Sequence, residues 1–360
     1  MKYIIIYDGG FGIFNSIFKI LEINEKSNCI IFVLYNPCRH NKFLGEFVSY
    51  KTYWINTLLF DFFFRKYSLT VKRLFAKLLK KILKFFSKEV YLINEYLNYY
   101  FKTNTSIFGS KDKSVWPDYL VHHKFLISNN YIKTEVPKIK LPSYIPKKNY
   151  YKTINLKIKK ATSGIESIYR NSSNIQEYSL VIKNLVEMDC FVFISGEIDV
   201  KILNYQNIFK HKNIKINEKK DRKLDIYAYL NSDCTIGPHS GSTNFNTIHY
   251  KPQLILDAYP IGHSWLNSTM AYKMVETNQT KFKQLLGRTR FPIKENLKVR
   301  NCNGFEINEI VLNYINNFNY NFVYGLSSED LKIKEICHFS LTGSKISDKW
   351  YELNKKILKD

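Results

Sequence analysis

The hydrophobic pattern at the start of the chain predicts two strands joined by a helix. Residues 3–7, Tyr-Ile-Ile-Ile-Tyr, form a continuous β-prone run, as expected for a strand that is buried on both faces. A loop with three glycines follows, and apolar residues then recur at helical spacing over residues 14–21. Residues 29–35 form a second β-prone run. This succession is typical of a parallel α/β layer.

The same pattern returns in the second half of the chain. Apolar residues at helical spacing begin at Ile175 and at Leu224, and short β-prone runs lie between and beside them. The predicted strands are residues 154–159, 191–194, 234–236 and 253–256, and further helices are predicted at residues 245–250, 306–315, 327–334 and 347–358. Residues 137–151 contain three prolines and little pattern, which indicates a linker between two α/β domains.

The loop at residues 238–244 is the feature around which the second half is organised. It reads Pro-His-Ser-Gly-Ser-Thr-Asn, leaves a predicted strand and opens a predicted helix. Open α/β sheets bind ligands at this edge, and a helix N-terminus favours an anion. Gly241 permits a close backbone approach, and Ser240, Ser242 and Thr243 each add a hydroxyl. Two interpretations remain open: an anion-binding loop, or a helix that Ser242 or Thr243 merely caps.

A second loop, Asp8-Gly9-Gly10-Phe11-Gly12, follows the first predicted strand. It does not match the dinucleotide fingerprint G-x-G-x-x-G. The loop either brings the backbone close to a sugar or phosphate, or forms a tight turn without a ligand. Asp8 is a candidate general base; the alternative is a carboxylate that accepts hydrogen bonds from the loop amides.

Residues 69–88 form a basic amphipathic segment. Its apolar positions are Val71, Leu74, Phe75, Leu78, Leu79, Ile82, Phe85 and Phe86, and its basic positions are Arg73, Lys77, Lys80, Lys81, Lys84 and Lys88. A helix of this kind suits the headgroup plane of an anionic inner leaflet, where each basic residue contributes about 1 kcal/mol. The alternative is a helix that packs on its own domain and directs its lysines to water.

Composition narrows the function classes. The chain has 360 residues, 45% of them hydrophobic, and a net charge of +23, which suggests an acidic partner such as a nucleic acid, an anionic membrane or a phosphorylated substrate. Lys is abundant together with Asn, Ile, Tyr and Phe, which indicates coding bias toward AT-rich codons. Part of the positive charge therefore carries no function. Six scattered cysteines predict reduced thiols in the cytoplasm rather than a zinc site or disulfides. We expect neither a signal peptide nor a membrane-spanning helix.

The order of several short motifs carries a family resemblance. Residues 169–257 contain Arg170-Asn171, a β-run that ends at Gly196-Glu197, then Ile236-Gly237, Ser240-Gly241-Ser242 and Pro252-Gln253-Leu254-Ile255. This region resembles a family of bacterial glycosyltransferases from surface-polysaccharide loci. It is more distantly similar to the heptosyltransferases of lipopolysaccharide assembly.

The resemblance implies an α/β fold of the GT-B type, with two Rossmann-like domains that face each other across a cleft. We expect an N-terminal acceptor domain at residues 1–148 and a nucleotide-sugar-binding domain at residues 149–335. A final helix at residues 336–360 would cross back to the first domain. The resemblance also implies transfer without a metal or other cofactor, and the sequence agrees because it lacks a D-x-D triad.

One departure from the family concerns the end of the first strand of the second domain. Relatives carry His or Arg there, whereas residues 156–160 of this chain offer only lysine as a basic residue. Lysine supplies a point charge but not the planar fork of arginine.

The predicted activity is transfer of a sugar from a nucleotide-sugar to a growing surface glycan at the inner face of the membrane. The predicted partners are this donor, a lipid-linked or oligosaccharide acceptor, and an anionic membrane surface that residues 69–88 contact. The predicted donor-binding residues are Lys160, Arg170, Gly196, Glu197, His239, Ser240, Gly241, Ser242 and Thr243, and the predicted acceptor-binding residues are Gly9, Gly10, Phe11 and Gly12. Asp8 is the predicted base.

Two other function classes are kept as alternatives. The first is a transferase of a non-sugar, phosphate-containing group to the same glycans. The second is a basic nucleic-acid-binding protein. The second is disfavoured because the sequence has no RNA-binding signature and its basic residues are spread along the chain.

Overall fold

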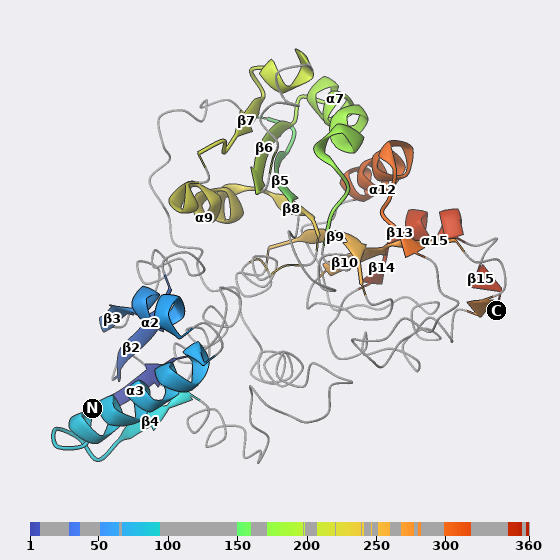
Figure 1. Ribbon diagram of the computed structural model, residues 1–360. Coiled ribbons are helices and arrows are strands. Elements are labelled where there is room, and N and C mark those ends of the chain that lie inside the picture. The colour runs from blue at the N-terminus through green and yellow to red at the C-terminus, as the bar shows by residue number, and fades with distance from the viewer. Residues whose placement is uncertain are drawn as a thin grey trace. The chain divides into compact units, whose positions relative to one another are not determined.

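The computed structural model comprises two units, Met1–Asn130 and Tyr131–Asp360 (Figure 1). The structure describes residues 1–7, 29–36, 51–64, 67–93, 150–159, 171–196, 198, 207–219, 221–238, 240, 246, 251–259, 268–276, 280–281, 299–317, 345–354 and 358–359. Most of the predicted linker, residues 137–149, lies outside these ranges, so the predicted domain limits stay a prediction.

The first unit contains a four-stranded parallel sheet with the order β3-β2-β1-β4. Its strands are β1 (Lys2–Ile6), β2 (Cys29–Tyr35), β3 (Lys51–Asn56) and β4 (Val90–Leu92). The predicted strands at residues 3–7 and 29–35 are confirmed. Ile4 lies opposite Ile31 on one side and Tyr91 on the other, and it is fully buried. The continuous apolar run therefore indicated a fully buried strand correctly, because β1 is an inner strand that is covered on both faces.

Two helices follow β3 in the first unit, α2 (Leu58–Phe63) and α3 (Ser68–Leu83). The predicted helix at residues 69–88 is confirmed, although it ends at Leu83. Helix α3 contacts β1 and β4, and its buried residues are Lys72, Ala76 and Leu83. This buried side differs from the apolar stripe that helical spacing predicts, because Leu74, Leu78 and Ile82 are exposed.

The second unit contains a seven-stranded parallel sheet with the order β14-β10-β9-β8-β5-β6-β7. Its strands are β5 (Thr153–Ile158), β6 (Phe191–Gly196), β7 (Ile214–Ile216), β8 (Cys234–Gly237), β9 (Gln253–Ala258), β10 (Ser268–Tyr272) and β14 (Lys345–Ile346). All four strands predicted in this part of the chain are confirmed. The prediction of an α/β chain with two Rossmann-like parallel sheets is therefore correct.

Two short strand pairs accompany this sheet. Strand β11 (Met274–Val275) pairs antiparallel with β13 (Val299–Arg300), and β12 (Thr280–Lys281) pairs parallel with β15 (Leu358–Lys359). The helix predicted at residues 347–358 is shorter than expected, because the chain has already entered β15 at Leu358.

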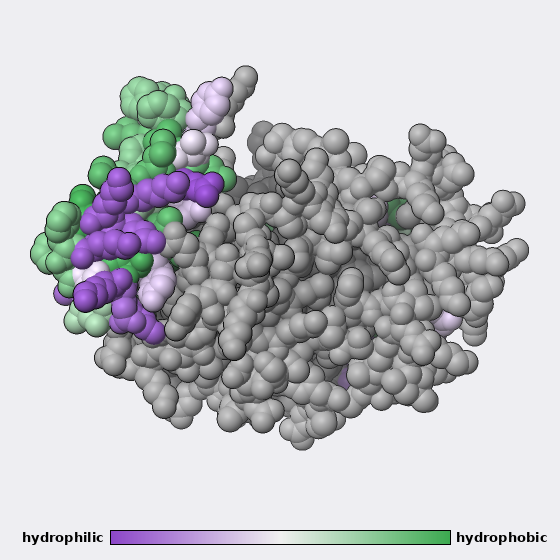
Figure 2. Space-filling view, turned by 90° about the horizontal axis from the view of Figure 1, so that it is seen from below, coloured by the Kyte–Doolittle hydropathy of each residue, from purple (hydrophilic) through white to green (hydrophobic). Residues whose placement is uncertain are grey.

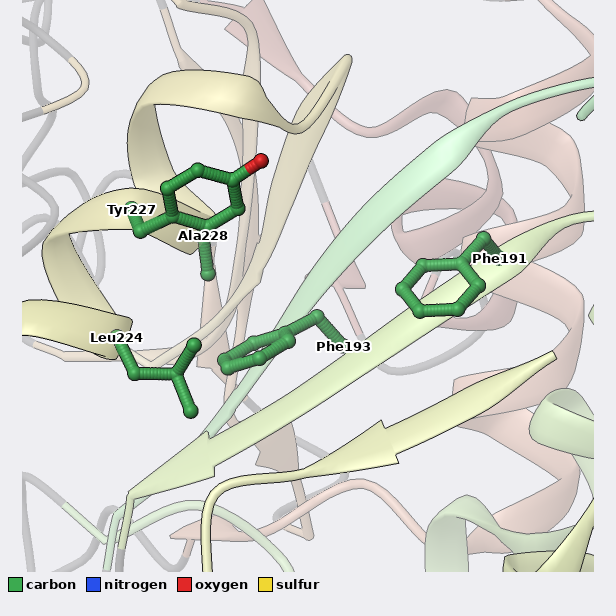
Figure 3. Packing of buried hydrophobic residues seen from close by; sticks show 5 residues of the cluster. All are labelled: Phe191, Phe193, Leu224, Tyr227 and Ala228. Atoms are coloured by element: carbon green, nitrogen blue, oxygen red, sulfur yellow. The ribbon is translucent and has the colours of Figure 1, made fainter. Parts of the chain in front are cut away.

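The helices of the second unit cover the sheet as their apolar faces predict. They are the 3-10 helices η2 (Ile175–Tyr178) and η3 (Asn207–Lys210) and the α-helices α7 (Ser179–Glu187), α9 (Arg222–Asn231), α12 (Gly304–Asn316) and α15 (Asp348–Asn354). Helix α9 lays Leu224, Tyr227 and Ala228 against Phe191 and Phe193 of β6 (Figure 3). Helix α12 confirms the helix predicted at residues 306–315, whereas residues 245, 247–250 and 327–334 lie outside the described ranges.

Helices α9 and α12 begin at side-chain caps. The Asp221 carboxylate accepts the backbone N–H of Lys223 at 2.9 Å. In α12, the Asn303 side chain accepts the backbone N–H of Glu306 at 3.0 Å, and the Glu306 carboxylate accepts the backbone N–H of Asn303 at 2.8 Å. These bonds satisfy amide groups that the first turn of a helix leaves without partners.

A row of buried polar side chains crosses three adjacent strands of this sheet, β6, β5 and β8. Asn155 of β5 donates to the Thr235 hydroxyl of β8 at 3.4 Å, and the Ser195 hydroxyl of β6 lies 3.5 Å from the Asn155 carbonyl oxygen. All three residues are buried. Because buried polar groups favour hydrogen-bonded partners, this row supports one register for β6, β5 and β8.

Candidate functional site

The strand order places a candidate ligand site at the carboxyl ends of β5 and β8. Strand β5 comes first along the chain in its sheet and lies between β6 and β8. The chain first builds outward through β6 and β7, and then returns to the other side of β5 with β8, β9 and β10. The order therefore reverses between β5 and β8. In open α/β sheets, ligands bind beyond the carboxyl ends of the strands at such a switch point.

Two glycines flank the carboxyl end of β5. Gly196 ends β6 with a φ of 109°, and a Cβ atom at this position would lie 1.9 Å from the carbonyl oxygen of Ile158. Gly237 ends β8, and a Cβ atom there would lie 2.7 Å from the carbonyl oxygen of Lys157. Neither position has room for a side chain. Three backbones therefore come together closely at the point where the strand order reverses.

The chain leaves β5 and returns to it through one hydrogen-bonded pair. The Ser172 backbone N–H donates to the Lys159 carbonyl at 3.0 Å, and the Lys159 backbone N–H donates to the Ser172 hydroxyl oxygen at 3.0 Å. Ser172 is buried. Lys160 and Arg170, which the sequence predicts at the donor phosphates, lie outside the described residues.

The Lys157 side chain of β5 forms an ion pair with the adjoining helix α9. Its ammonium lies 3.1 Å from Asp225 Oδ2 of α9 and 5.8 Å from the ring centre of Tyr229. Asn217 donates to the other Asp225 oxygen at 2.7 Å. Burial lowers the pKa of Lys157, but Tyr229 and Asp225 outweigh this effect and raise the pKa overall. Lys157, one of the lysines at residues 156–160, is thus already paired within the protein.

We expect Lys157→Met to lower the free energy of unfolding by about 2 kcal/mol, since it removes a largely buried hydrogen bond between charged groups. Affinity for a nucleotide should stay within twofold of the parent protein. Urea unfolding and calorimetric titration measure the two quantities on the same sample. A tenfold loss of nucleotide affinity without a loss of stability would assign Lys157 to the ligand instead.

Asp257 organises a buried cluster at the carboxyl end of β9. Its backbone has a φ of 51°, in the left-handed region that side chains other than glycine rarely adopt. Its carboxylate accepts the backbone N–H groups of Ser173 at 3.0 Å and Cys302 at 2.7 Å. The Ser173 hydroxyl lies 3.1 Å from the same carboxylate and 2.5 Å from the Cys302 carbonyl oxygen. One carboxylate thus joins the segments before η2 and before α12 to the end of β9.

Lys273 supplies the opposite charge in this cluster. It follows β10, is 2% exposed, and donates to the Asn171 carbonyl at 3.3 Å and to the Asn301 side chain. Burial raises the pKa of Asp257, and the Lys273 charge opposes this shift. Burial also lowers the pKa of Lys273, which the Asp257 charge opposes. Each charge therefore lowers the cost of burying the other.

Sequence reasoning missed both Lys157–Asp225 and the Asp257 cluster. The sequence does show a charged residue at the end of an apolar run, as in Leu-Ile-Leu-Asp at residues 254–257. It does not show which residue binds that charge, because Asp257 and Ser173 are separated by 84 positions in the chain.

The structure describes two of the predicted site residues. Gly196 lies at the carboxyl end of β6, as stated above, and Ser240 lies two residues beyond the last described residue of the β8 segment, partly buried. The other predicted site residues lie outside the described ranges: Asp8, Gly9, Gly10, Phe11, Gly12, Lys160, Arg170, Glu197, His239, Gly241, Ser242 and Thr243.

Within the described ranges, no three His, Cys, Asp or Glu side chains gather as a metal site would require. Four described cysteines are buried free thiols, and burial raises the pKa of the Cys190 thiol to about 11. No helix in the described part of the chain has both the length and the apolar character needed to cross a bilayer.

Comparisons with known proteins find likeness in structure. No protein-family model and no curated protein sequence matches the chain. Among solved structures, it is similar to E. coli heptosyltransferase WaaC with ADP-2-deoxy-2-fluoro heptose, at 8% identity and a TM-score of 0.42, over 75% of this chain and 92% of that one. It is also similar to E. coli ADP-heptose lps heptosyltransferase II, at 11% identity and a TM-score of 0.42, over 78% of this chain and 92% of that one.

Proposed function

We propose that the protein is a glycosyltransferase that moves a sugar from a nucleotide-sugar to a growing surface glycan at the inner face of the membrane. One observation carries the proposal. The strand that leads into the hydroxyl-rich loop at residues 238–244, β8, lies beside β5, where the strand order of the sheet reverses. This is the edge at which doubly wound sheets bind nucleotides.

The backbone around this edge suits a phosphate group. Gly196 and Gly237 let the ends of β6 and β8 pack directly against the backbone of β5, so no side chain of these two residues stands at this edge. Ser240, Ser242 and Thr243 would add hydroxyl groups, and the helix that follows would direct its amino end toward the phosphates. Lys160 or Arg170 would add positive charge, His239 would contact phosphate or sugar, and Glu197 would accept hydrogen bonds from the nucleoside.

The reaction places two demands on the protein. A sugar leaves its nucleotide through an oxocarbenium-like state, so the protein must stabilise the departing phosphate and activate an acceptor hydroxyl. In this proposal the 240–243 loop and the basic residues meet the first demand without a metal. Asp8, which follows β1, accepts the acceptor proton, and Gly9, Gly10, Phe11 and Gly12 bind the acceptor.

Donor binding is the first test. We expect the double change Ser240→Ala and Ser242→Ala to weaken nucleotide binding about tenfold, since each lost hydrogen bond contributes about 0.5–1.5 kcal/mol. Calorimetric titration of ADP, UDP, GDP and CMP finds the preferred nucleotide in the parent protein and then compares the variant. Thr70→Ala, which removes an exposed hydroxyl from α3, is the control and should change nothing. Equal affinity in the double variant would remove the loop from the site.

Turnover separates the sugar and non-sugar hypotheses. The protein is incubated with a panel of nucleotide-sugars and, separately, with other activated phosphate-containing donors, together with lipid-linked oligosaccharide acceptors. Release of free nucleotide from a nucleotide-sugar alone supports the proposal. Consumption of a non-sugar donor alone would contradict it, as would the absence of any nucleotide binding.

A further inference from the structure

Helices α2 and α3 leave a large apolar surface uncovered. Phe62 and Phe63 of α2 are 67% and 69% exposed, and Leu74 of α3 is 61% exposed. We call this surface the α2–α3 apolar face; its members are Leu58, Leu59, Phe62, Phe63, Leu74, Leu78, Ile82, Phe85 and Phe86, all of them exposed. In Figure 2, apolar side chains (green) border hydrophilic ones (purple) over this part of the molecule. Exposed apolar surface of this extent marks an interaction site.

The two helices are held as one unit by a buried ion pair. Lys72 of α3 donates to both carboxylate oxygens of Asp61 in α2, each at 2.8 Å, and Asn36 after β2 donates to the same carboxylate at 2.5 Å. The rings of Phe60 and Phe75 meet edge to face, with centroids 5.6 Å apart. Burial raises the pKa of Asp61, but the bonds from Lys72 and Ser68 outweigh this effect and lower it overall.

This arrangement explains why α3 shows its apolar stripe to solvent. The side of α3 that faces the sheet and α2 carries Lys72, Ala76 and Leu83. Leu74, Leu78 and Ile82, spaced four residues apart, therefore point away from the sheet, together with part of the basic side. A helix that merely packed on its own domain would bury this stripe instead.

The charges beside the face select an anionic partner. Arg73, Lys77, Lys81, Lys84 and Lys88 are all exposed. Asp61 is the one acidic residue between residues 57 and 88, and Lys72 neutralises it. A second copy of the chain would bring the same positive charges together, which opposes self-association through this face. A nucleic acid would match the charges but leave the apolar side chains in water.

We infer that α2 and α3 insert together into an anionic lipid bilayer, with the α2–α3 apolar face at the boundary between headgroups and acyl chains. The exposed basic residues then lie among anionic headgroups, as in interfacial amphipathic helices. This inference rests on the proposed function, because membrane binding would hold the glycosyltransferase beside a lipid-linked acceptor. The sequence predicts membrane contact through residues 69–88 alone. The structure adds α2 to the membrane-binding surface, and it adds the exposed apolar side chains of α3 as the part that inserts.

Vesicle co-sedimentation of the full chain tests the inference with two variants and two matched controls. The apolar variant carries Leu74→Gln, Leu78→Gln and Ile82→Gln, and its control carries Tyr151→Gln, Leu180→Gln and Phe305→Gln, which change three exposed apolar residues of the second unit. The charge variant carries Lys77→Glu, Lys81→Glu and Lys84→Glu, and its control carries Lys210→Glu, Lys212→Glu and Lys219→Glu, with the same change in net charge.

We expect the parent protein and both controls to bind vesicles of phosphatidylcholine with phosphatidylglycerol, and to bind pure phosphatidylcholine more weakly. The charge variant should lose on the order of a hundredfold in partitioning to the anionic vesicles, since each basic residue contributes about fivefold. The apolar variant should lose at least about tenfold. It should also lose the binding that the parent keeps at about 1 M salt, where the screening length is about 3 Å.

Four results would overturn the inference. Three of them concern vesicles: absence of vesicle binding by the parent, an equal loss in a variant and its control, and full binding by the apolar variant, which would mean that only charge attracts the chain. The fourth concerns self-association. A parent protein that dimerises in size-exclusion chromatography, and an apolar variant that does not, would assign the face to a second copy. Nucleotide titration of the same variants separates the two proposals, because lost docking with intact nucleotide binding leaves the transferase hypothesis standing.

Discussion

Gly196→Ala is expected to lower the free energy of unfolding by about 3 kcal/mol and to weaken nucleotide binding more than tenfold. The added methyl group would lie 1.9 Å from the Ile158 carbonyl oxygen, inside any tolerable contact distance. The backbone φ of 109° is also one that alanine adopts only under strain. The chain can relieve the overlap only by separating β6 from β5, and β5 forms one side of the candidate site.

Two other glycines serve as controls for this prediction. Gly237→Ala brings a methyl group 2.7 Å from the Lys157 carbonyl oxygen without a left-handed backbone, so a smaller loss of stability is expected. Gly304 is the first residue of α12, and a Cβ atom there would lie 3.0 Å from its nearest neighbour, the Glu177 carbonyl oxygen. The loss of stability in Gly304→Ala should be smaller still. Urea unfolding ranks the three variants. A Gly196→Ala protein as stable as Gly304→Ala would show that β6 and β5 are not held as closely as described.

Asp257→Asn is expected to lower the free energy of unfolding by about 3 to 5 kcal/mol, because it leaves the Lys273 ammonium buried without its counter-charge. Lys273→Met alone should cost a similar amount by leaving the carboxylate unmatched. The double variant should cost less than the sum of the two, which a double-mutant cycle measures directly. Glu187→Gln, in an exposed pair with Lys183 at 3.9 Å, is the control and should change stability very little.

The pH dependence of Asp257→Asn gives a second measurement. Burial already lowers the pKa of Lys273, and removal of the Asp257 charge lowers it further. A lysine with a depressed pKa in the folded state contributes stability above its unfolded pKa of about 10.4, and this contribution is lost as the pH falls. The variant should therefore recover part of its stability relative to the parent as the pH rises toward about 10.4. A difference that is independent of pH would mean that the loss arises from the hydrogen bonds to Ser173 and Cys302 alone.

Much of the secondary structure could be predicted from the sequence because the signals are local. The runs at residues 3–7, 29–35 and 253–256 contain enough β-prone residues to predict strands without knowledge of their neighbours, and each is a strand. Asn303 and Glu306 also form a local cap, three residues apart. Strands β3 and β4 were not predicted. Strand β4 has three residues, too few for a pattern to show.

The candidate site could be predicted only in outline. A small-residue loop after a strand indicates the sheet edge, but the sequence does not show that β8 lies beside β5 rather than beside another strand. Gly196 was predicted as a donor contact, which stays a prediction; the sequence did not show that this glycine also lets the Ile158 carbonyl approach β6. Lys157 was one of several candidate positive charges, and its partner Asp225 lies 68 positions further along the chain.

The sequence by itself determined that this is an α/β chain with a basic amphipathic segment and a hydroxyl-rich loop after a strand, because periodicity and local residue chemistry act over a few neighbours. Only the tertiary structure decided the order of the strands, the pairing of Asp257 with distant segments, and which side of α3 is buried. These depend on contacts between residues far apart in the chain. The burial of Lys72 shows the reason: a lysine considered by itself is expected to lie in water, and an aspartate on a different helix makes its burial favourable.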